Sequence, residues 1–114
     1  MNFKWSVYQA DLNPVIGSEQ QGKRPVLVIS DETFNAIMPV VSVLPITSLK
    51  KGRRVYPNEA LIKKGTGGVD VDSLVLAHQI RTIAKQRLLA CLGSIDLAAL
   101  QTTINEALRV HLNL

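Results

Sequence analysis

The chain has 114 residues, a net charge of +4 and an isoelectric point near 9.5, which suit one domain over residues 1–114 and favour acidic or polyanionic partners. Its residues are 46% hydrophobic, but no apolar run is long enough to cross a membrane and the first residues lack a signal-peptide core. A single cysteine, Cys91, excludes an internal disulfide and a cysteine-based zinc site, so we expect a cytoplasmic protein.

Short β-rich segments separated by turn residues follow one another along most of the chain. Alternation and β-branched residues predict strands over residues 7–12, 25–29, 40–44, 56–62, 73–79 and 88–95, with a helical turn over 32–37. We expect Asp96 to cap a C-terminal helix, since apolar residues then recur at helical spacing to about His111. The pattern predicts a mainly β domain, either a compact barrel or a strongly bent sheet, with a closing helix.

A polar loop precedes the second predicted strand, with the sequence G-S-E-Q-Q-G-K-R-P over residues 17–25. Two glycines bracket it, which predicts an exposed and mobile segment. Pro25 holds Arg24 extended at the point where the loop meets the strand. Hydroxyl, amide, backbone N–H and guanidinium donors therefore lie together, a combination that suits a phosphate-rich ligand.

Other candidate residues have a structural and a functional interpretation that composition cannot separate. Arg24 alone could be a solvated loop arginine, and Thr47 could be ordinary strand structure or a turn hydroxyl. His78 is a candidate general base, or a strand-end histidine with a structural hydrogen bond. The basic segments 50–54 and 63–64 are solvated charge, or they border a groove for a phosphate backbone. Cys91, among apolar neighbours, is expected to be buried and inert.

Two classes of site have little support in the sequence. The chain has five aromatic residues, which argues against a base-stacking platform built on several exposed aromatics. No carboxylate cluster or histidine pair has metal-ligand spacing. We therefore expect no cofactor and a metal-independent mechanism.

Three segments, in order, resemble the MazF/PemK family of toxin ribonucleases from bacterial toxin–antitoxin pairs. These are the loop G-S-E-Q-x-G-x-R-P with the hydrophobic strand after it, the segment P-I-T-S at 45–48, and Q-I-R-T-I with K-Q-R-L at 79–88. The resemblance runs from about Val7 to Leu112. It implies a small SH3-like barrel, related to that of CcdB-like toxins, with short helices and the C-terminal amphipathic helix. The chain start departs from the family, having Trp5-Ser6 where relatives commonly have a glycine and an acidic residue.

The resemblance also implies roles for individual residues. Arg24 falls on the family's catalytic arginine and Thr47 on its second catalytic position. The positions expected to contact RNA are Ser18, Glu19, Gln20, Ser48, Lys50, His78 and Gln79. At His78 relatives often carry an acidic residue. Because a guanidinium rarely gives up its proton, we expect Arg24 chiefly to bind and neutralise the scissile phosphate.

The implied function is a sequence-selective endoribonuclease toxin that cuts single-stranded RNA, in particular messenger RNA, and inhibits translation and growth. The family implies a homodimer that an acidic, MazE-like antitoxin inhibits by filling the RNA groove. Two alternatives stay open at this point: a CcdB-like DNA gyrase poison on the same fold, or a non-catalytic RNA-binding module. Neither needs the combination of Arg24 and Thr47 for chemistry.

Overall fold

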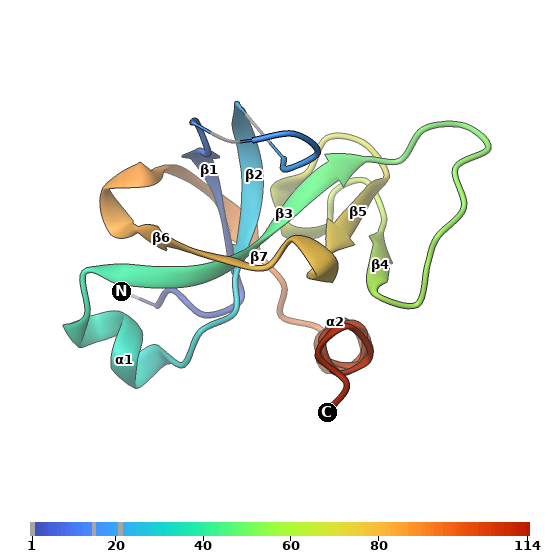
Figure 1. The fold of residues 1–114 in the computed structure, drawn as a ribbon. Coiled ribbons are helices and arrows are strands. Elements are labelled where there is room, and N and C mark those ends of the chain that lie inside the picture. The colour runs from blue at the N-terminus through green and yellow to red at the C-terminus, as the bar shows by residue number, and fades with distance from the viewer. Residues whose placement is uncertain (1, 15, 21) are drawn as a thin grey trace.

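The computed structural model describes residues 2–14, 16–20 and 22–114 (Figure 1). This part of the chain is mainly β, as the sequence predicts, with two α-helices and three 3₁₀ turns. The strands are β1 (Ser6–Asp11), β2 (Lys23–Val28), β3 (Val40–Ser48), β4 (Glu59–Ile62), β5 (Ser73–Leu76), β6 (Arg81–Ala84) and β7 (Leu88–Ser94). The helices are α1 (Glu32–Ile37) and α2 (Ala98–Leu112), and the 3₁₀ turns are η1 (Thr66–Gly68), η2 (Ala77–Gln79) and η3 (Lys85–Arg87).

Strand β3 organises the sheet because it changes partner along its length. Along one edge it pairs first with β6 over Val40–Val43 and then with β5 over Ile46–Ser48, and on the other edge it pairs with β2 over Val43–Pro45, antiparallel in each case. The neighbour order is β4-β5-β3-β2-β1-β7, with β6 joined to β3 outside this path. Among the described residues the sheet is strongly bent, one of the two arrangements that the sequence pattern predicts, and its closure into a barrel is not detected.

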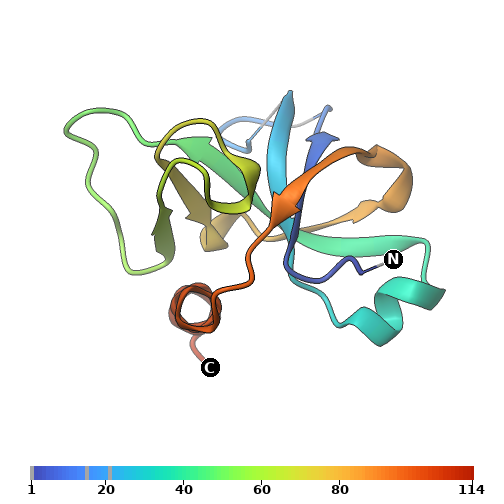
Figure 2. The same ribbon diagram turned by 180° about the vertical axis from the view of Figure 1, so that it is seen from behind.

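The strands bury two hydrophobic clusters, one on each face of β2 and β3. Leu27 and Leu44 belong to the first cluster, whereas their neighbours Val26 and Val43 belong to the second. This division follows from the alternation of side chains along a strand. Helix α2 contributes Ile104 to the first cluster, and both views show the helix end-on beneath the strands (Figures 1 and 2). Burying one such aliphatic side chain is worth about 1.5–3 kcal/mol.

Helix α1 begins and ends where the sequence predicts. The side chain of Asp31 accepts a hydrogen bond from the N–H of Thr33 and caps the helix. The Glu32 carboxylate accepts bonds from the backbone N–H groups of Phe3 and Lys4, at 2.7–3.1 Å. Burial raises the pKa of Glu32, but hydrogen bonds from Asn35 and these N–H groups outweigh it, so the net pKa lies below its ordinary value. Glu32 thus ties the chain start to the first residue of α1.

Turn η1 lies directly against β7, and glycines make this approach possible. Gly68 has φ +82, and a Cβ there would lie 2.1 Å from the carbonyl oxygen of Leu92. A Cβ on Gly93 would lie 2.9 Å from the carbonyl carbon of Gly67. The contact therefore requires glycine on both segments, and it fixes the position of residues 69–73, which follow the turn.

Two local expectations are wrong. Cys91 is exposed, not buried, because β7 pairs only with β1 in the described sheet, so most of its side chains have few neighbours. Asp96 does not cap α2: its carboxylate accepts from the hydroxyl of Ser94, and the residue before the helix is Leu97. Within the described ranges, no helix is long and apolar enough to span a membrane.

Candidate active site

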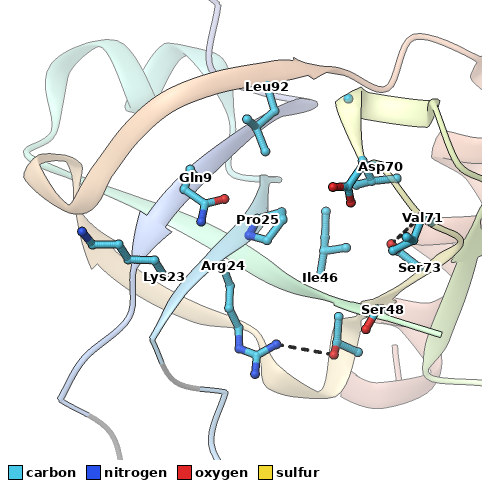
Figure 3. A pocket seen from close by; sticks show the side chains of 13 residues that line it. Gln9, Lys23, Arg24, Pro25, Ile46, Ser48, Asp70, Val71, Ser73 and Leu92 are labelled. Carbon is cyan, nitrogen blue, oxygen red and sulfur yellow. Dashed lines mark hydrogen bonds between the residues drawn. The ribbon is translucent and has the colours of Figure 1, made fainter. Parts of the chain in front are cut away.

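Strands β2 and β3 bring Arg24 and Thr47 together. The two strands are antiparallel neighbours with Val26 opposite Pro45, so Arg24 and Thr47, two residues away on each strand, also face each other. Arg24 Nη1 lies 3.5 Å from Thr47 Oγ1 (Figure 3). Both side chains are half-buried. A fixed cation beside a hydroxyl is an arrangement that can bind a phosphate group.

A pocket of about 560 Å³ adjoins this pair. Alternation along the strands sends Pro25 and Ile46 to the opposite face from Arg24 and Thr47, and in Figure 3 Arg24 extends from β2 away from Pro25. The Arg24–Thr47 pair therefore lies at the border of the pocket. The full lining is Gln9, Lys23, Arg24, Pro25, Ile46, Thr47, Ser48, Gly68, Val69, Asp70, Val71, Ser73 and Leu92.

Few of the other predicted RNA-contacting residues line this pocket. Ser48 does, and it is exposed. Ser18, Glu19 and Gln20 lie in the loop between β1 and β2, outside the pocket lining. The Glu19 carboxylate accepts from the N–H of Ile16 at 2.8 Å, whereas Gln20 Oε1 is buried and has no partner among the described residues. Residue 21 of this loop lies outside the described residues.

His78 makes a structural hydrogen bond at the end of β5, one of the two interpretations that the sequence left open. Its Nε2 lies 2.8 Å from Oε2 of Glu59, and its ring lies edge-on to that of His111 with 6.4 Å between centroids. Gln79 ends the same 3₁₀ turn, η2, and Lys50 is exposed in the loop between β3 and β4. None of these three residues lines the pocket.

Nothing in the sequence singles out Glu59, but in the structure its buried carboxylate is the centre of an ionic cluster. Besides His78, its carboxylate binds both terminal nitrogens of Arg53, at 3.0 and 2.7 Å, and the N–H of Tyr56 at 3.0 Å. Burial raises the pKa of Glu59, but these hydrogen bonds outweigh it and bring the pKa to about 2. Arg53 is therefore held in an ion pair and is not simply solvated charge, one of the two interpretations that the sequence left open for segment 50–54.

Charged and polar residues missed by the sequence analysis also include Gln9, Asp70 and Ser73 of the pocket lining. Nothing in a single sequence marks them, because only the fold brings these distant segments to one cavity. Within the described residues, no group of three or more His, Cys, Asp or Glu side chains could hold a metal ion.

The family model for PemK-like, MazF-like toxins of type II toxin–antitoxin systems matches residues 4–112. The chain therefore belongs to the MazF/PemK family of type II toxin–antitoxin systems.

The chain is similar to two curated endoribonucleases over almost its whole length. It is 39% identical to endoribonuclease MazF9 of Mycobacterium tuberculosis (strain ATCC 25618 / H37Rv) over 113 residues, covering 95% of this chain and 93% of the relative. It is 41% identical to endoribonuclease EndoA of Bacillus subtilis (strain 168) over 109 residues, covering 95% and 91%. At this similarity the chain is a MazF-like endoribonuclease, which favours the ribonuclease over the gyrase poison and the non-catalytic module.

Solved structures share the fold. MazF (Form-I) from Deinococcus radiodurans superposes with a TM-score of 0.80 at 27% identity, covering 97% of this chain and 96% of that one. An endoribonuclease in complex with its cognate antitoxin from Mycobacterial species gives a TM-score of 0.80 at 25% identity, covering 100% and 97%.

Proposed function

We propose that this endoribonuclease toxin cuts single-stranded messenger RNA at selected sequences and so inhibits translation and growth in the cytoplasm. The observation that carries the proposal is the juxtaposition of Arg24 Nη1 and Thr47 Oγ1, at 3.5 Å, beside the exposed loop between β1 and β2. The two residues occupy the positions that correspond to the family's catalytic pair. Net positive charge favours the polyanionic substrate.

The least demanding chemistry uses the nucleophile that RNA itself carries. The 2′-hydroxyl next to the scissile phosphate gives up its proton and forms a bond from O2′ to phosphorus. The bond from phosphorus to O5′ breaks, and O5′ takes up a proton. Arg24 binds the phosphate and compensates its growing charge, and the Thr47 hydroxyl donates to a phosphate oxygen. The products are a 2′,3′-cyclic phosphate and a 5′-hydroxyl end.

The remaining RNA contacts fall into two groups. The hydroxyl, carboxylate and amide of Ser18, Glu19 and Gln20 act from the loop between β1 and β2, and Ser48 and Lys50 act from the end of β3. Gln79 reads a base edge from η2. His78, whose Nε2 lies 2.8 Å from Oε2 of Glu59, contacts RNA from the same turn.

The partners follow from the relatives. The protein acts as a homodimer, and an acidic MazE-like antitoxin with a disordered tail inhibits it by occupying the RNA groove. The support is the relative solved with its cognate antitoxin, at 25% identity, and the basic charge of this chain. Size-exclusion chromatography with light scattering tests the dimer.

The decisive experiment maps the 5′ ends of RNA after brief expression and then repeats the cleavage in vitro on the RNA so identified. We expect cutting at one short motif, 5′-hydroxyl ends, full activity in excess EDTA, and no cutting when the nucleotide before the cut carries a 2′-deoxyribose. Efficient cutting of the 2′-deoxy substrate, or activity that chelation removes and added metal restores, would show that the mechanism is metal-assisted hydrolysis.

A further inference from the structure

The loop between β3 and β4 is held by an ionic cluster around one buried carboxylate, although most of the loop residues are exposed. Glu59 is 5% exposed, and its carboxylate accepts four hydrogen bonds, two from Arg53, one from the N–H of Tyr56 and one from His78 Nε2. Each carboxylate oxygen has two partners, as a buried charge requires. Residues 53–56 are therefore fixed to the sheet at β4. We refer to Arg53, Glu59 and His78 as the Glu59 cluster.

The Glu59 cluster and the Arg24–Thr47 pair lie on the same face of the sheet. Thr47 is paired with Leu74, and Leu74 is paired with Leu61 on β4. Glu59 is paired with Leu76, two residues along both strands, so its side chain points to the same face as that of Thr47. Glu59 lies two strands away from Thr47 and two residues further along the strand direction, which places their Cα atoms roughly 12 Å apart. A few nucleotides of RNA cover this distance.

Tyr56 presents an aromatic ring beside the Glu59 cluster. It is 50% exposed, and its backbone is fixed on both sides, since Tyr56 N–H donates to Glu59 and Tyr56 C=O accepts from the N–H of Glu59 at 2.9 Å. The guanidinium carbons of Arg53 and Arg54 lie 5.7 and 5.8 Å from the ring centroid. A flat apolar ring bordered by two cations offers a stacking surface for a base and charge for its phosphates.

The other aromatic residues differ from Tyr56. Phe3, Trp5 and Tyr8 pack against the two core clusters. Phe34 is 57% exposed, but it lies on α1, which follows β2 at the opposite end from Arg24 (Figure 1). Phe34 therefore provides a matched control: an exposed aromatic residue away from the proposed RNA path.

Building on the proposed ribonuclease function, we propose that Tyr56 stacks on a base of the RNA a few nucleotides from the scissile phosphate. The Glu59 cluster is the positioning device that holds Tyr56 for this contact. Stacking tolerates any base, so Tyr56 contributes to affinity and to the length of RNA that is bound, while hydrogen-bonding residues contribute the choice of sequence. A single anchored ring replaces the platform of several aromatics that the composition argues against.

The test uses the RNA motif mapped in cells, made with a 2′-deoxyribose at the cut site and 2-aminopurine at one position at a time. Stacking on Tyr56 should quench 2-aminopurine at one position with the wild-type protein and with Tyr56→Phe, but not with Tyr56→Ala. On cleavable RNA, Tyr56→Ala should raise KM about 10- to 100-fold with kcat within about twofold. Phe34→Ala should leave both constants unchanged. A Tyr56→Ala variant that binds and cuts as the wild type does would overturn the stacking proposal and leave the ribonuclease function intact.

A double-mutant cycle tests the positioning role of Glu59. Glu59→Gln, checked for folding by circular dichroism, should raise KM, and adding Tyr56→Ala should raise it little further, because both changes remove the same contact. Independent, additive effects would overturn the positioning role. Absence of RNA binding by the wild-type protein would overturn the proposed function together with this inference.

Discussion

Arg24 Nη1 lies 3.5 Å from Thr47 Oγ1, so a cation on β2 and a hydroxyl on β3 can contact one phosphate group. This geometry gives Arg24 two tasks, charge compensation and orientation of the phosphate. Arg24→Lys keeps the charge and loses the planar fork, so the two tasks can be separated. We expect Arg24→Ala to lower kcat by about 10²–10³-fold or more, and Arg24→Lys to recover only part of this loss. Single-turnover cleavage of the mapped RNA measures both. Full activity of Arg24→Ala, with a wild-type circular dichroism spectrum, would move the active site elsewhere.

Thr47 is predicted to act through its hydroxyl and not through its shape. Thr47→Val removes the donor from a half-buried side chain of similar size, and Thr47→Ser keeps it. By analogy with the loss of one oxyanion donor, Thr47→Val should lower kcat about 10²–10³-fold, whereas Thr47→Ser should stay within about tenfold of the wild type. Equal activity of the two variants under single-turnover conditions would show that the hydroxyl takes no part.

The contact between η1 and β7 should appear directly in stability. Gly68→Ala places a Cβ 2.1 Å from the Leu92 carbonyl oxygen and also strains a backbone with φ +82. Gly65→Ala introduces only the backbone strain, because φ there is +92 but nothing lies within 4 Å of the added Cβ. We expect Gly65→Ala to lower the free energy of unfolding by about 1–2 kcal/mol and Gly68→Ala by distinctly more. Urea unfolding followed by the fluorescence of Trp5 measures the difference. Equal losses would mean that η1 and β7 are not in close contact in solution.

Local patterns predicted local structure well. Helix α1 coincides with residues 32–37, and the strands expected at 7–12 and 88–95 lie within one residue of β1 and β7. The sequence pattern predicts that the third strand ends at Leu44, just before Pro45. In the fold, Pro45 lies where β3 changes partner from β6 to β5, a place where a missing N–H donor is tolerated. The predicted strand was therefore four residues too short.

The pairing of segments that lie far apart in the chain could not be predicted from the sequence. Strand β6 escaped prediction because residues 81–84 become a strand only by pairing with the start of β3, some forty residues away. Cys91 was expected to be buried from its apolar neighbours, which cannot show that β7 lies at the end of the sheet order. Likewise, the motifs pointed to Arg24 and Thr47. The role of Glu59 depends on its ion pairs with Arg53 and His78, which lie on two other segments of the chain. A lone glutamate in a strand carries no such signal.

The Glu59 cluster predicts how stability depends on pH. Burial raises the pKa of Glu59, and the hydrogen bonds from Arg53, Tyr56 N–H and His78 outweigh it, so the folded pKa is about 2 against 4.5 for an ordinary glutamate. The unfolded chain therefore binds this proton more tightly, and the stabilisation is present in full above about pH 4.5 and is lost as the pH falls towards 2. Its size is on the order of 3 kcal/mol.

Glu59→Gln should lower the free energy of unfolding at pH 7 and remove this part of its decline below pH 4.5. Glu106→Gln, which breaks only an exposed ion pair with Arg109, is the matched control and should shift the curve by less than about 1 kcal/mol. Urea unfolding at intervals from pH 7 to pH 3 measures all three proteins. A Glu59→Gln variant that declines as steeply as the wild type below pH 4.5 would show that the carboxylate does not keep these hydrogen bonds in solution.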